Sequence, residues 1–254
     1  MYAIKTIIYY TALSLLRQKI TSFFLITTIF LIGIGTLMST VDIGIRFRLF
    51  ENILLASQTL LIHLFAWIYT FEQWRKEFSQ NLFVLPLSTD ISRFQYLVGR
   101  YLGIVSVVII LSSSLLLIDL VLLRVIEQQW LFFPLIQIFF ICLSAILSIS
   151  CFYFFVNITS PIQAMLYCIA LWFIGHGLDE FVLFSQADKN SLLNIFSQVL
   201  YYFLPNFSVY DLTSAIINRT NITLYQLVSP IIYTFGYSFI LIYLSCLIFS
   251  KKNL

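Results

Sequence analysis

The sequence contains few charged residues. Only 10% of its 254 residues are Asp, Glu, Lys or Arg, and 61% are hydrophobic. Because soluble domains carry roughly 25% charged residues, this composition excludes a soluble globular domain and predicts that most of the surface contacts lipid. The mean hydropathy of +0.97 points the same way. A net charge of +3 is too small to indicate a nucleic-acid partner.

The sequence also lacks several catalytic and metal-binding signatures. It has eight glycines and no G-x-x-x-x-G-K-[ST] loop, so we expect that this chain does not hydrolyse ATP itself. The motifs H-E-x-x-H and G-x-S-x-G are missing, which argues against intramembrane proteases of these kinds. The four cysteines lie in apolar runs without a C-x-x-C pair, which argues against a disulfide framework or a thiolate metal site. We therefore expect no catalytic residue, metal or cofactor in this chain.

Long uncharged runs predict an all-α membrane protein with six spans, because one span takes ~20 apolar residues. From Gln128 to Leu178 there is no Asp, Glu, Lys or Arg. This run is long enough for two spans, and Pro161 in its middle predicts a tight turn. Residues 1–19 are basic and apolar and are expected to lie along the membrane interface. Within one transmembrane domain over 1–254, the predicted spans are 20–41, 52–71, 101–123, 131–156, 161–181 and 229–250.

The positive charges predict that both ends of the chain are cytoplasmic. Cytoplasmic segments then hold nine of the fourteen lysines and arginines, as the positive-inside rule favours. These are Lys5, Arg17, Lys19, Arg75, Lys76, Arg93, Arg100, Lys251 and Lys252. The connector 182–228 is then extracytoplasmic. Within it, 191–203 has an apolar and a polar helical face but is too short to span, which predicts an interfacial or re-entrant helix.

Residues 72–100 form the most polar part of the predicted cytoplasmic side. Trp74, Phe78 and Leu82 are spaced i, i+4 and i+8, so they are expected to share one helical face, with charged residues around the rest. Such a helix either lies in the lipid headgroups or docks onto a soluble partner. Composition alone does not decide between the two.

Two glycines and a histidine stand out inside predicted spans. Gly99 and Gly103 form a G-x-x-x-G that lets another helix approach closely. His63 lies in the middle of the second span, where ionisable groups are expensive and often functional. It either lines a transport pathway or is a neutral imidazole bonded to a neighbouring helix, and we favour the second interpretation.

His176, Asp179 and Glu180 lie close together at the end of the fifth predicted span. Their spacing of i, i+3 and i+4 places them on one helical face, which is compatible with a weak metal site. A solvated helix end is the interpretation we favour. Two histidines, three methionines and no thiolate pair also argue against a copper-conducting path.

Five short motifs carry a family resemblance. They are Leu16-Arg17-Gln18-Lys19 before span one, Tyr69-Thr70-Phe71-Glu72 closing span two, Leu85-Pro86-Leu87-Ser88 in the loop, Leu97-Val98-Gly99-Arg100-Tyr101-Leu102-Gly103 entering span three, and Tyr202-Phe203-Leu204-Pro205-Asn206-Phe207 before span six. Together they resemble the permease subunits of ATP-binding-cassette exporters of the second type, which have the type V exporter fold. Within that family the chain looks similar to permeases of multicopper-enzyme maturation, as in nitrous-oxide reductase assembly. The chain departs from the pattern at Lys76-Glu77-Phe78-Ser79, where the family often has a glycine-threonine pair.

The resemblance implies a membrane-spanning subunit of an ATP-driven transporter in a bacterial inner membrane. Its partners would be a second copy of the permease and a separate cytoplasmic ATPase that binds ATP and Mg. The segment Glu72–Leu82 would be the coupling helix seated in a groove of the ATPase. The implied coupling residues are Glu72, Trp74, Arg75, Lys76, Glu77, Phe78 and Leu82. A non-transporting membrane scaffold or assembly protein is the alternative, which explains the spans but not the resemblance.

Overall fold

The computed structural model describes residues 2–38, 46–80, 91–127, 133–187, 191–212 and 223–251. Within these ranges every regular element is helical and no strand occurs, as the predicted all-α class requires. The elements are α1 (Tyr2–Leu16), α2 (Lys19–Met38), α3 (Arg46–Gln80), α5 (Arg93–Glu127), α6 (Phe133–Val156), α7 (Pro161–His176), α8 (Leu178–Ala187), α9 (Ser191–Phe203), the short 3-10 helix η1 (Ser208–Tyr210) and α11 (Leu224–Lys251).

Several of these helices are compatible with a multi-pass membrane protein. Within the described ranges, four are long and apolar enough to cross a bilayer, and the bent pair α7–α8 makes a fifth if it counts as one span. The four are Asn52–Phe78, Arg93–Ile118, Leu135–Val156 and Leu224–Lys251. α2 covers most of the first predicted span. Six spans and cytoplasmic ends stay predictions.

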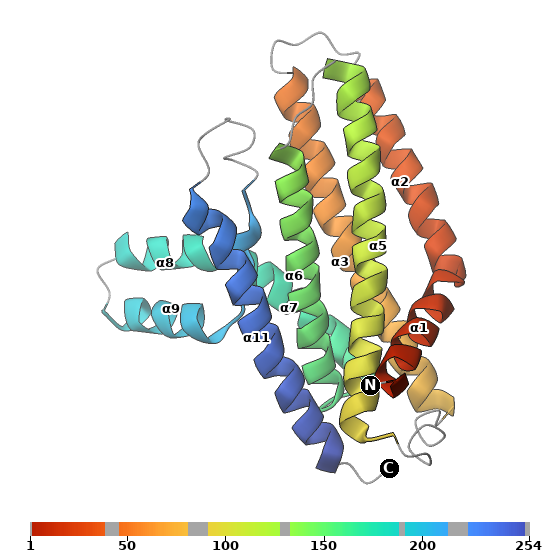
Figure 1. The fold of residues 1–254 in the computed structure, drawn as a ribbon. Helices are drawn as coiled ribbons and strands as arrows, with labels where there is room; N and C mark the ends of the chain where they lie inside the picture. Colours follow the sequence, from red (N-terminus) through yellow and green to blue (C-terminus); the bar gives the residue numbers. More distant parts are fainter. Residues whose placement is uncertain are drawn as a thin grey trace.

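The long helices form one bundle. α3, α5 and α6 lie at its centre, with α1 and α2 on one side and α7 and α11 on the other (Figure 1). Three serines of α6 hydrogen bond across to the two neighbouring central helices. The pairs are Ser144 with His63, Ser148 with Trp67, and Ser150 with Tyr101. Small hydroxyl residues suit this place because they let helices approach closely and still satisfy polar groups.

The second predicted span is part of a longer helix. α3 runs from Arg46 to Gln80 without a break, so the span predicted at 52–71 and the polar stretch after it are one helix. The reason is local, because no glycine or proline interrupts this stretch. Glu72 also pairs with Arg75 and Lys76, three and four residues further on, which supports the helix at its polar end.

The fifth predicted span, 161–181, is bent. α6 ends and α7 begins around the turn that the sequence predicts at Pro161, where Ser160 and Gln163 form a capping box. α7 stops at His176, and α8 continues after Gly177 at an angle of 47°. The predicted span therefore coincides with two shorter helices, which make one bent span if they cross the membrane together.

The segment between α9 and α11, which contains Pro205 and Phe207, packs against the bend and stabilises it. A Cβ atom on Gly175 would lie 2.5 Å from the Phe207 ring and 2.5 Å from the Pro205 carbonyl oxygen, so only glycine admits this segment. The Phe207 N–H also donates to the Gly175 carbonyl at 3.1 Å. The end of α7 is thus tied to residues about 30 positions later in the chain.

α8 and α9 form a hairpin that projects from one side of the bundle (Figure 1). α9 covers the stretch 191–203 for which the sequence predicts an interfacial or re-entrant helix. The hydroxyls of Ser185 and Ser197, both buried, hydrogen bond between the two helices at 2.6 Å. The apolar side of α9 faces outward, which is typical of a helix that contacts lipid. Its exposed residues include Leu192, Ile195, Phe196, Val199 and Phe203.

Candidate functional site

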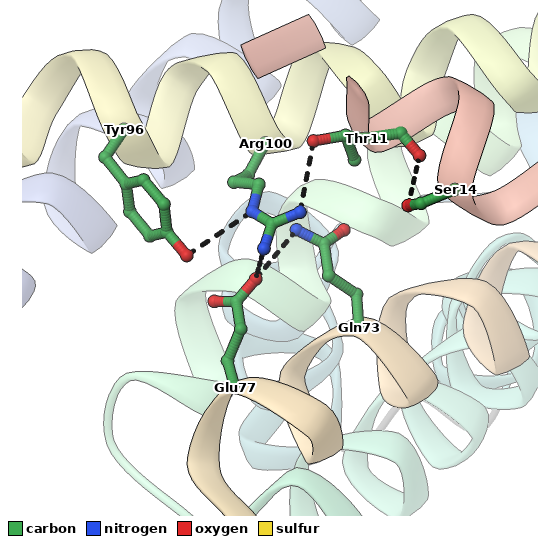
Figure 2. Close-up of polar contacts among 6 residues, drawn as sticks. All are labelled: Thr11, Ser14, Gln73, Glu77, Tyr96 and Arg100. Atoms are coloured by element: carbon green, nitrogen blue, oxygen red, sulfur yellow. Dashed lines mark hydrogen bonds and ion pairs between the residues drawn. The ribbon is translucent and has the colours of Figure 1, made fainter. Parts of the chain in front are cut away.

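A buried ion pair lies at the end of the bundle where α1 begins and α11 ends. The Nη2 atom of Arg100 on α5 is 2.6 Å from Oε1 of Glu77 on α3. Glu77 is only 1% exposed, and the Arg100 side chain is 21% exposed. Figure 2 shows the pair and the polar side chains around it. In an apolar bundle such charges are tolerated only when they are paired and hydrogen bonded.

Two glycines bring α1 to this ion pair. A Cβ atom on Gly99 would lie 2.9 Å from Cγ2 of Ile7, and one on Gly103 would lie 2.6 Å from Cβ of Thr11. The G-x-x-x-G of α5 is therefore the surface on which α1 packs. This close approach places the Thr11 hydroxyl 3.2 Å from Nη1 of Arg100, which donates to it.

The guanidinium of Arg100 has a partner on each of its nitrogen atoms. Besides the bonds to Glu77 and Thr11, its Nε donates to the Tyr96 hydroxyl at 3.4 Å, and the guanidinium lies 5.5 Å from the centre of the Tyr96 ring. Gln73 donates to Oε1 of Glu77 at 3.3 Å. These contacts join α1, α3 and α5 through one charged centre (Figure 2). Removing one partner of such a pair typically costs about 3–5 kcal/mol, because the other charge is left buried and unpaired.

Aromatic rings extend this centre to α6 and α11. The Trp74 ring on α3 lies 5.4 Å from the Tyr153 ring on α6 and 6.4 Å from the Phe249 ring on α11. Arg93 of α5 donates to the Ser250 carbonyl at 2.9 Å, where α11 ends. A cation at a helix C-terminus is favourable because it meets the negative end of the helix dipole. Five helices therefore converge at this end.

The last turns of α3 also present an exposed surface beside the buried pair. The side chains of Arg75 and Lys76 are 56% and 45% exposed, and Phe78 is 39% exposed. Glu72 holds Arg75 at 3.0 Å and Lys76 at 4.0 Å. The surface thus combines two cations, one carboxylate and one aromatic ring, a composition compatible with lipid headgroups and with a protein partner.

The predicted coupling residues therefore fall into two groups. Trp74 and Glu77 are 3% and 1% exposed, so they do not lie on the exposed surface, and their role in coupling stays a prediction. They belong to the packing behind the exposed surface. The Trp74 and Phe78 rings lie 5.9 Å apart, on neighbouring turns of one helical face. Leu82 lies outside the described residues.

His63 is buried in the bundle, away from the ion pair. Its Nδ1 donates to the Thr59 carbonyl at 2.8 Å, and its Nε2 lies 2.9 Å from the Ser144 hydroxyl on α6. Because a carbonyl can only accept, the ring carries a proton on Nδ1, and in the neutral ring Ser144 donates to Nε2. Thr59 and Ser144 also line a cavity of about 240 Å³, whose wall includes His176 and Gln137. A role of His63 in a transport pathway stays a prediction.

The acidic residues at the start of α8 are not arranged around His176. Nδ1 of His176 donates to a backbone carbonyl of its own helix at 2.8 Å. Asp179 accepts from the Asn206 amide at 3.0 Å and from the Ser208 hydroxyl, and Glu180 is exposed. Within the described ranges, no three His, Cys, Asp or Glu side chains lie close enough to hold a metal ion.

The sequence analysis missed the partners of Glu77. It used Arg100 as a charge that orients the chain and as part of a family motif, and it gave no role to Thr11, Gln73 or Tyr96. A partial signal was present, because Arg100 stands at the start of a long uncharged stretch and Glu77 is one of four charged residues in the six that follow another. Ionisable residues within membrane helices usually face the bundle and pair with one another. That rule predicts a carboxylate partner for Arg100 but does not choose between Glu72 and Glu77.

Comparisons with known proteins do not assign a family. No family model, no curated protein and no solved structure matches this chain. The class that the fold defines is an all-helical protein with several helices able to cross a membrane. Any finer identity is a proposal that rests on the residues and on their geometry.

Proposed function

We propose that this chain is the membrane-spanning subunit of an ATP-driven exporter, powered by a separate cytoplasmic ATPase. Two kinds of support meet in the same segment. The motifs between Glu72 and Gly103 resemble exporter permeases, and that segment holds an exposed helix end joined to a buried ion pair. The single observation that carries the proposal is this joining of Glu77 to Arg100 directly behind the exposed surface.

The arrangement suits the transmission of force from a partner. A protein that pushes on Arg75, Lys76 or Phe78 pushes on the end of one continuous helix. α3 has 35 residues, about 50 Å at 1.5 Å per residue, which is longer than the ~30 Å hydrocarbon core of a bilayer. The ion pair makes α5 and α1 follow the end of α3. Binding and release of ATP by the partner would then move three helices together.

The remaining parts of the proposal come from the resemblance. The resemblance implies that transport is export, that the membrane is a bacterial inner membrane, and that the working unit is a dimer of two permease copies. Rocking of the helix bundles would open a path between the two copies to each side of the membrane in turn. The alternative role, a membrane scaffold, predicts no ATPase partner.

Co-purification tests the proposal. The tagged chain is extracted from its native host in mild detergent, and the proteins that accompany it are identified by mass spectrometry. We expect a soluble protein with a G-x-x-x-x-G-K-[ST] motif in a stoichiometric amount. Repeated recovery of the chain alone, or only with other membrane proteins, would favour the scaffold.

Single substitutions sharpen this test. We expect Phe78→Ala and Glu72→Ala to reduce recovery of the ATPase while membrane insertion stays normal, because aromatic and charged anchors carry much of an interface's energy. Loss of one such anchor, worth about 2 kcal/mol, weakens binding about 30-fold. Phe30→Ala is the matched control, because this ring is 68% exposed on α2. Full ATPase recovery with both test variants would rule out the coupling role of this surface.

A further inference from the structure

A second cavity lies where α9, the segment 204–212 and α11 meet. Its volume is about 510 Å³, within the ~300–1,000 Å³ of typical small-molecule sites. It is separate from the ion pair at the end of the bundle and from the cavity next to His63. The residues that line it are Tyr201, Tyr202, Asn206, Val209, Tyr225, Val228, Ser229, Ile232 and Tyr233.

Tyrosines dominate the lining of this cavity. Four of its nine lining residues are tyrosines, and none of the nine carries a charge. The Tyr233 hydroxyl accepts from the Asn206 N–H at 2.8 Å, which holds this ring in the wall. Aromatic rings attract cations through their negative faces, and tyrosine adds a hydroxyl for hydrogen bonding. The lining therefore suits a cation better than an anion.

A carboxylate next to the cavity adds a negative charge. Asp179 accepts from the side chain of Asn206, which is itself 97% buried and part of the lining. Burial raises the pKa of Tyr201, and the charge of Asp179 raises that pKa further. Tyr201 therefore keeps its proton, so the charge at this end of the cavity is that of Asp179.

Apolar surfaces adjoin the cavity on both of its helices. On α11, Ile232 of the lining is 67% exposed, and Phe235 and Phe239 are 68% and 73% exposed. On α9, Phe203 is 76% exposed. A molecule with its polar end in the cavity can therefore lay a hydrocarbon chain along α11, where lipid would otherwise lie.

We propose that this cavity binds the headgroup of an amphiphile that carries an ammonium cation, with its hydrocarbon chain along α11. The tyrosine rings surround the cation and Asp179 supplies the opposite charge. Both a membrane lipid with an ammonium headgroup and a soluble alkylammonium compound have this chemistry. The inference does not depend on the ATPase, because the site lies within a single chain.

Photolabelling of the purified chain in dodecyl maltoside tests the site. The probe is a decyltrimethylammonium ion with a diazirine next to the headgroup, and the control probe is the corresponding decyl sulfonate. We expect the cationic probe to label peptides that contain 201–209 and 225–233, and the sulfonate to label them much less. Equal labelling by the two probes, or labelling spread over all apolar helices, would overturn the proposal.

Competition separates the headgroup from the chain. Excess decyltrimethylammonium should abolish the labelling, whereas the same concentration of tetramethylammonium should not. Competition by tetramethylammonium at the same concentration would show a site for a free cation and refute the amphiphile. In lipid nanodiscs, phosphatidylcholine or phosphatidylethanolamine that competes with the probe would identify a membrane lipid as the source. Labelling that survives both lipids would indicate a soluble alkylammonium compound.

Variants of exposed tyrosines test whether the cationic probe binds in this cavity. Tyr202 and Tyr225 are 82% and 78% exposed, so replacing either with alanine removes little packing. Loss of one ring should reduce affinity about 2- to 5-fold, the range for cation–π contacts at exposed sites. Ser229→Trp should block the cavity. The matched control is Tyr9→Ala on α1, which removes a tyrosine that is 62% exposed outside the cavity.

All variants are first compared by size-exclusion chromatography and thermal unfolding, so that loss of labelling in a folded protein is attributed to the site. Labelling unchanged by Tyr202→Ala, Tyr225→Ala and Ser229→Trp would overturn the proposal. Because the assay uses the chain alone, its result is independent of whether an ATPase co-purifies.

Discussion

Breaking the buried ion pair should destabilise the protein more than any change on its exposed surface. Glu77→Leu leaves the Arg100 guanidinium in the bundle with only the neutral Thr11 and Tyr96 as partners. The cost of such an unpaired buried charge is about 3–5 kcal/mol. Arg100→Met should cost a similar amount, because it leaves the carboxylate, 1% exposed, without its cation.

The double variant Glu77→Leu with Arg100→Met provides the decisive comparison. It removes both charges and fills the space with apolar side chains, which is often neutral or stabilising relative to a buried pair. We therefore expect the double variant to be more stable than either single variant. If the two residues acted independently, the loss of stability in the double variant would equal the sum of the two single losses. A smaller loss in the double variant therefore indicates a buried pair.

The buried cysteines provide the assay. Cys151, Cys168 and Cys246 are free and buried, so a maleimide dye reacts with them only as the protein unfolds. The melting temperature in detergent then ranks the variants. Arg75→Ala is the control, because it breaks an exposed contact with Glu72 and should leave the melting temperature unchanged. Additive losses in the double variant would refute the reasoning.

Two glycine substitutions test the close approaches in the fold. Gly103→Ala should lower stability by about 1–3 kcal/mol, because its Cβ would lie 2.6 Å from a side chain of α1, whereas Gly236→Ala on α11 meets nothing within 4 Å and should be neutral or slightly stabilising. Gly175→Ala should destabilise the bend between α7 and α8, because its Cβ would lie 2.5 Å from a carbonyl oxygen and from an aromatic ring. The maleimide assay measures all three variants, and equal melting temperatures for them would contradict both expectations.

Features with local causes could be read from the sequence. The uncharged run from Gln128 to Leu178 and Pro161 in its middle were enough to place the turn between α6 and α7. The two faces of 191–203 were enough to predict α9, because a helical period is a property of neighbouring residues. The all-α class followed from the long uncharged runs, which are also a property of neighbouring residues.

Features that depend on distant residues were out of reach. At the bend near Gly177, the segment around Phe207 packs against Gly175. No pattern in the neighbouring residues predicts that contact. Glu77 and Arg100 are separated by the polar loop, so their pairing needs the arrangement of α3 and α5. The burial of Trp74 follows in the same way from α6 and α11, which supply the rings around it.

The unequal strength of the contacts indicates where the bundle can move. The ion pair joins α3 to α5, and α1 packs closely on Gly99 and Gly103 of α5. α6, in contrast, contacts α11 through hydrogen bonds such as that of Asn157 with Ser245 at 2.6 Å. Interhelical hydrogen bonds in membranes contribute about 0.6 kcal/mol on average, whereas removing one partner of the buried pair costs about 3–5 kcal/mol, because the other charge is left unpaired. We therefore expect α1 and α5 to stay together while α11 shifts against them.

Spin labels can measure this difference in lipid nanodiscs, with labelled chain diluted in unlabelled chain. Tyr9 on α1, Ile110 on α5 and Ile232 on α11 are 62%, 48% and 67% exposed, so labels there disturb little packing. The distance distribution between the α1 and α5 labels should be narrow, and that between the α1 and α11 labels broader. Arg100→Met should broaden the first distribution, because it removes the hydrogen bond from Arg100 of α5 to Thr11 of α1. Two equally narrow distributions in the unsubstituted protein would mean that the bundle moves as one body, and the ion pair would then be a stabilising contact rather than a link in transport.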